Sequence, residues 1–73
     1  MSILPITSAR DVLRKLLRAG FRIVVQKGSH IKLKHMMTGK VTNLPLHSTD
    51  IGRKLLTKIL KQAGLSVDDF LKL

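Results

Sequence analysis

The stretch VVQKGSHIKLKH, residues 24–35, decides the fold, because it contains two strand-like runs joined by a Gly-Ser turn at 28–29. In residues 30–35, apolar and polar side chains alternate, which is typical of a half-buried β-strand. Ile31 and Leu33 point to one face of this strand. The side chains on the opposite face are His30, Lys32 and Lys34. The pattern therefore predicts a hairpin that exposes a histidine among lysines.

Two further strands are predicted on either side of this one. In residues 21–27 (FRIVVQK), strict alternation puts Phe21, Ile23 and Val25 on one face. The opposite face would carry Arg22, Val24 and Gln26. Residues 41–47 (VTNLPLH) form the last strand, with Leu44 and Leu46 on its apolar face and Pro45 suited to a sheet edge.

A helix is expected before the strands. Ser8 and Asp11 have the spacing of a capping box, and Gly20 is a good residue to end the helix. Apolar residues recur between them at helical spacing and predict a buried face. These residues are Ala9, Val12, Leu13, Leu16 and Leu17.

A second helix is expected after the strands, roughly from Ile51 to Ala63, with Asp50 or Thr49 as its cap and Gly64 at its end. Its predicted apolar face consists of Leu55, Leu56, Ile59, Leu60 and Ala63. A short terminal helix should begin at Ser66, with Phe70 and Leu71 packing back onto the core.

The expected order is α-β-β-β-α in a single domain spanning residues 1–73, an α+β fold. Three antiparallel strands with the helices packed on one face would bury the apolar stripes together. The other sheet face would stay exposed and would carry the histidine and lysines of residues 30–34.

The charge of the chain indicates a polyanionic partner. Lys and Arg number 14 against 4 Asp and Glu, which leaves a net charge of +10. The chain has no cysteine, no apolar run long enough to cross a membrane and no signal-peptide pattern, so a cytoplasmic protein is expected. Nucleic acid and an acidic protein both fit as partners, and a membrane does not.

His30 is the candidate catalytic residue. A neutral imidazole can take the proton of an RNA 2′-hydroxyl, and its cation can protonate a leaving oxygen. His35 has the opposite strand parity and is expected to be structural, whereas His47 could assist or could simply cap the second helix. Without nearby acids these histidines make a poor metal site, and no nucleotide-cofactor motif is present, so neither metal nor cofactor is expected.

Arg10, Arg14 and Arg18 recur every four residues along the first helix. They form either a stripe that follows RNA phosphates or an ordinary solvated face, and the sequence leaves both interpretations open.

Four segments resemble one family in order and spacing. They are SARDVLRKLLRAGF at 8–21, QKGSH followed by IKLKH at 26–35, LPLH at 44–47 and the closing stretch at 55–73. Together they are similar to HicA-type toxins, the ribonucleases of bacterial and archaeal toxin–antitoxin pairs.

The resemblance implies a fold like that of a double-stranded-RNA-binding domain and metal-independent cleavage of mRNA. It also implies that His30, in the GSH segment, is catalytic and that an acidic HicB-type antitoxin neutralises the toxin. The expected RNA contacts are Lys27, Ser29, Lys32, Lys34, Arg10, Arg14 and Arg18. The alternative is an RNA-binding module that shares the fold but does not cleave.

Overall fold

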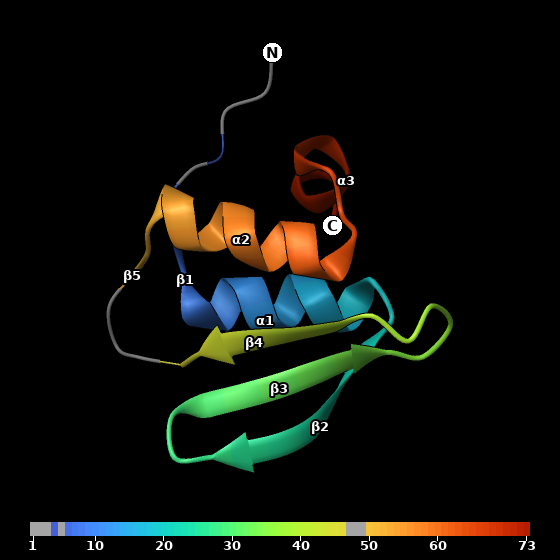
Figure 1. Ribbon diagram of the computed structural model, residues 1–73. Helices are drawn as coiled ribbons and strands as arrows, with labels where there is room; N and C mark the ends of the chain where they lie inside the picture. The colour runs from blue at the N-terminus through green and yellow to red at the C-terminus, as the bar shows by residue number, and fades with distance from the viewer. Residues whose placement is uncertain (1–3, 5, 47–49) are drawn as a thin grey trace.

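The computed structural model describes residue 4 and residues 6–46 and 50–73, and it confirms the expected α-β-β-β-α order (Figure 1). Two very short strands and a terminal helix complete the chain. The elements are β1 (Thr7–Ser8), α1 (Ala9–Arg18), β2 (Phe21–Lys27), β3 (His30–His35), β4 (Val41–Pro45), β5 (Asp50–Ile51), α2 (Arg53–Ala63) and α3 (Val67–Leu71).

The main sheet is antiparallel with the strand order β2-β3-β4, so the histidine-bearing strand lies in the middle. Both α1 and α2 lie on the same side of this sheet (Figure 1). Among the residues that the structure describes, the core between the layers is apolar except for the buried Thr42. Its main side chains are Val12 and Leu16 from α1, Phe21 from β2, Ile31 and Leu33 from β3, Leu44 from β4, and Leu56, Ile59 and Leu60 from α2.

The ends of the first and last helices follow the predicted chemistry. The Ser8 Oγ accepts a hydrogen bond from the Asp11 amide at 3.1 Å, and the Ser66 Oγ accepts one from the Asp69 amide at 3.0 Å. Gly20 has φ +105°, a value that L-residues rarely adopt, which explains why glycine follows α1. These local signals therefore fix where α1 ends and where α3 begins.

The predicted start of the second helix is wrong. Asp50 and Ile51 form β5, which pairs antiparallel with β1, so α2 begins only at Arg53 with Gly52 as its N-cap. Ile51 is buried in this arrangement, and the backbone pairing with β1 holds it in an extended conformation. The alternative cap, Thr49, lies outside the described residues.

The predicted apolar faces were too wide. Leu17 is 44% exposed, Leu55 37% and Leu71 39%, whereas Leu13 is half-buried. Leu17 and Leu55 each line a groove at the surface instead of the core. Phe70 is buried as predicted, and the Lys15 ammonium lies 4.8 Å from its ring centroid, which helps to hold α3 against α1.

Candidate functional site

His30 is the first residue of β3 and its side chain is exposed, as the alternation predicts. Its position is fixed on both sides, because its Cα pairs with that of Lys27 on β2 and with that of Pro45 on β4. The Leu46 amide also donates a hydrogen bond to the Ser29 carbonyl, which ties the turn before His30 to the end of β4. The backbone below the imidazole is therefore held by both neighbouring strands.

A β-bulge in β2 changes which residues share the face of His30. The pairing runs from Ile23 with Leu33 directly to Val25 with Lys32, which leaves Val24 as the extra residue. The predicted facing of Val25 is therefore wrong, because it lies on the outer face with Lys32 instead of on the face of Ile23. After the bulge, Lys27 also reaches the outer face, opposite His30.

The outer face of the sheet is a basic surface built from three rows of cross-strand neighbours. Direct opposition of Arg22 and Lys34 is unfavourable, since like charges repel across an antiparallel pair. The sequence offers no Asp or Glu between residues 12 and 49 to relieve that repulsion. The rows are Lys27–His30–Pro45, Val25–Lys32–Asn43 and Arg22–Lys34–Val41. This surface therefore favours a bound polyanion.

A groove of about 200 Å³ opens beside His30. Its other walls come from β4 and from the exposed side of α2, which passes along the free edge of β4. The lining residues are His30, Asn43, Pro45, Leu55, Lys58, Ile59 and Gln62. The imidazole thus lies where the basic surface meets a partly apolar groove.

The remaining predicted contacts lie in two places. Ser29 is half-buried in the turn that precedes His30. Arg10, Arg14 and Arg18 are exposed on α1, and Arg14 forms an ion pair with Asp11 at 2.9 Å. Because α1 covers the inner face of the sheet, these arginines do not share a face with His30.

His35 lies at the opposite end of β3 from His30. The His35 ring packs edge-on against Phe21, with ring centroids 5.0 Å apart, and its Nε2 lies 2.9 Å from the Ala19 carbonyl oxygen. Its Nδ1 accepts hydrogen bonds from the amides of Met37 and Thr38, both at 3.1 Å. The structural role predicted for His35 is confirmed, and His47 lies outside the described residues.

Sequence reasoning missed Arg22, Lys58 and Gln62. Arg22 could have been found, because strict alternation from Phe21 already places it on the outer face. Lys58 and Gln62 gave no such signal, since only the packing of α2 beside β4 brings them to His30.

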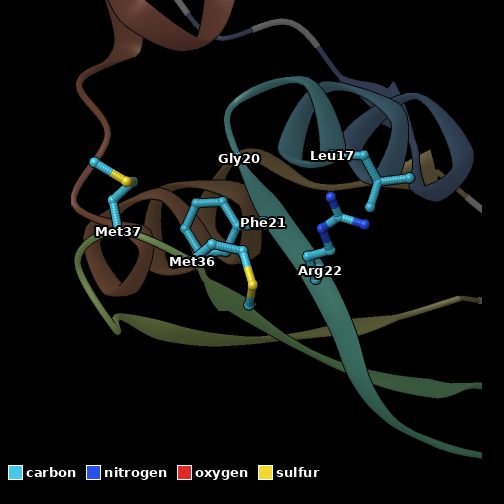
Figure 2. Close-up of a pocket in the computed structure, with 6 residues that line it drawn as sticks. All are labelled: Leu17, Gly20, Phe21, Arg22, Met36 and Met37. Carbon is cyan, nitrogen blue, oxygen red and sulfur yellow. The ribbon is translucent and has the colours of Figure 1, made fainter.

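A larger groove of about 440 Å³ lies at the far end of β2, between the end of α1 and the β3–β4 turn (Figure 2). It is lined by Leu17, Gly20, Phe21, Arg22, Met36 and Met37. Arg22 is the one ionisable group among these lining residues, so the groove offers neither a nucleophile nor a proton acceptor for catalysis.

Two further observations concern the described residues alone. Within residues 4, 6–46 and 50–73, no group of three or more His, Asp or Glu side chains could hold a metal ion. No helix in that part of the chain is long and apolar enough to cross a membrane.

The chain also matches a known protein family. Residues 9–65 match the family described as the HicA toxin of bacterial toxin–antitoxin systems. The matched region runs from the start of α1 to just past the end of α2, so it includes the whole main sheet and the groove. A comparison with curated proteins found no match.

Proposed function

The chain belongs to the HicA family of toxins of bacterial toxin–antitoxin systems, and we propose that it is a metal-independent endoribonuclease that cleaves mRNA in the cytoplasm. The observation that carries this proposal is the position of His30. It is an exposed imidazole fixed on the middle strand, inside a surface where it is surrounded by the side chains of lysines and an arginine.

His30 would act as the proton-transfer group. Its neutral imidazole takes the proton of the RNA 2′-hydroxyl, whose oxygen then attacks the adjacent phosphorus. The bond from phosphorus to the 5′-oxygen breaks, and that oxygen takes the proton from the imidazolium. The products are a 2′,3′-cyclic phosphate and a free 5′-hydroxyl. This step needs neither a water molecule nor a metal ion.

The flanking cations would bind the phosphate backbone. Lys27 lies directly opposite His30, and Lys32 lies two residues further along the same strand face. Ammonium groups at these positions can stabilise the negative charge that develops on the phosphate during attack. In this proposal His30 transfers the proton, and the lysines bind the phosphate and stabilise its negative charge.

The test uses purified chain, an mRNA substrate and the variant His30→Ala. We expect His30→Ala to abolish cleavage while the circular dichroism spectrum stays unchanged, because an exposed side chain contributes little packing. Wild-type cleavage should survive a chelator, and a 2′-deoxy substitution at the cut site should block it. Cleavage by His30→Ala at the wild-type rate would refute the role of His30.

The alternative function is an RNA-binding module without catalytic activity. The basic surface alone would suffice for binding, so this alternative leaves the exposed His30 without a role. It predicts a wild-type chain that binds RNA without cutting it and that does not stop cell growth when induced.

Membership in a toxin family implies an antitoxin partner. We propose an acidic HicB-type protein that covers His30, Lys32 and Lys34, because Asp and Glu would complement this surface while excluding RNA. Residues 28–35 should then gain protection from hydrogen exchange in the complex. Protection confined to residues 66–73 would show that the antitoxin does not act by covering this face.

A further inference from the structure

The groove beside His30 has a composition that phosphate binding alone does not explain. Its walls include the apolar side chains of Pro45, Leu55 and Ile59, and Leu55 remains 37% exposed there. Two amide side chains, Asn43 and Gln62, complete the lining together with Lys58. Apolar walls with a few fixed polar groups are typical of sites that bind a small organic group.

A buried hydroxyl orients one of these amides. The Thr42 side chain is fully buried, and its hydroxyl lies 3.0 Å from the Gln62 Oε1, to which it donates a hydrogen bond. That hydroxyl also lies 3.4 Å from the Ile59 carbonyl oxygen, so Thr42 fastens β4 to α2 at this point. With its oxygen held, Gln62 offers its NH₂ group as a donor to a ligand in the groove.

The second amide approaches from the sheet. Asn43 is exposed on β4 and pairs across the strands with Lys32, on the same face as His30. Its side chain has both a donor and an acceptor. Asn43 and Gln62 therefore place hydrogen-bonding groups from two different elements around one small space.

We propose that this groove binds a single unstacked nucleobase of the RNA next to the scissile phosphate, so that Asn43 and Gln62 determine which sequences are cut. Pro45 and Leu55 contact the faces of the base, and Lys58 neutralises the neighbouring phosphate. This inference rests on the proposed ribonuclease function of His30. The base-binding groove adds a site of sequence specificity to the proposed ribonuclease.

A base fits the groove better than a second phosphate does. The ionisable groups in the lining are His30 and Lys58, whereas the amides match the donors and acceptors on a base edge. Its volume of about 200 Å³ is below the range of roughly 300–1,000 Å³ that holds drug-sized ligands, which suits one base rather than a whole nucleotide. Because no Phe, Tyr or Trp is among the described residues that line the groove, apolar contact replaces stacking on such a ring here.

The test is cleavage of an RNA pool with randomised sequence, followed by sequencing of the cut ends. We expect the wild type to prefer particular bases beside the cut. Gln62→Met and Asn43→Val should each weaken that preference about tenfold while cleavage continues, because each removes hydrogen bonds to one base. Lys58→Gln should instead slow the cutting of all sequences alike, because a phosphate contact carries no sequence information.

The matched control is Gln26→Met, the same substitution on an exposed strand residue outside the groove. It should leave both the rate and the preference unchanged. A wild-type chain that cuts without preference, or a preference unaltered in both Gln62→Met and Asn43→Val, would overturn the base site and leave the ribonuclease intact. Absence of cleavage by the wild type would overturn the proposed function and the base site with it.

Discussion

Replacing each histidine of β3 in turn should separate catalysis from stability. His30 and His35 are the first and last residues of the same strand, so the two alanine variants make a matched pair. His30→Ala should remove cleavage and leave the free energy of unfolding within about 0.5 kcal/mol of the wild type, as is usual for exposed positions. His35→Ala should instead keep cleavage and lower the free energy of unfolding.

The magnitude for His35→Ala follows from its contacts. The hydrogen bond that its Nε2–H donates to the Ala19 carbonyl is partly buried and contributes roughly 1 kcal/mol. The edge-on packing against Phe21 contributes about 0.5–1.5 kcal/mol. The two bonds from the amides of Met37 and Thr38 are exposed, so water replaces them at small cost. We therefore expect His35→Ala to lower the free energy of unfolding by about 2 kcal/mol.

Urea unfolding followed by circular dichroism measures this loss, and RNA cleavage is assayed well below the melting temperature. A loss of about 2 kcal/mol corresponds to a fall in Tm of roughly 8–16 °C for a domain of this size. The folded fraction of His35→Ala should still cleave RNA. If His35→Ala loses cleavage while keeping wild-type stability, the assignment of structural and catalytic roles to the two histidines is wrong.

Four other perturbations test the remaining features. RNA affinity should fall steeply between 50 and 200 mM salt, since phosphate binding releases counterions. Lys32→Ala should slow cleavage more than Arg10→Ala does. Equal effects of the two substitutions would indicate a diffuse basic surface. Ser8→Ala should lower the free energy of unfolding by about 1 kcal/mol through loss of the cap on α1, measured by urea titration. Gly20→Ala should lower the Tm, because φ is +105° and the added Cβ would lie 2.9 Å from the His35 Nε2; an unchanged Tm would contradict this.

Local signals in the sequence predicted much of the fold. Ser8 and Ser66 cap the helices they precede, and Gly20 and Gly64 follow α1 and α2 with positive φ values. The alternation in residues 30–35 gave the facing of every residue in β3 correctly. These features succeed because each depends on residues within one turn or one strand.

Features that depend on distant segments were not predictable. The pairing of β5 with β1 moves the start of α2 by two residues, although nothing in residues 50–52 shows that β1 lies alongside. The groove beside His30 likewise depends on where α2 passes along β4. The exposure of His30 can therefore be predicted from its strand, whereas the residues proposed to select its substrate are found only in the packed structure.

The bulge at Val24 reverses which face the following residues of the edge strand β2 point to. Phe21 is the one residue of β2 that is buried, and Arg22 to Lys27 are all exposed. A strand held against the core by alternate residues cannot change parity without burying its polar side chains. Beyond Phe21 the core places no such limit on β2, so one extra residue is tolerated there. The result is that Lys27 changes faces and lies opposite His30, which adds a cation to the proposed active site at little cost to the core.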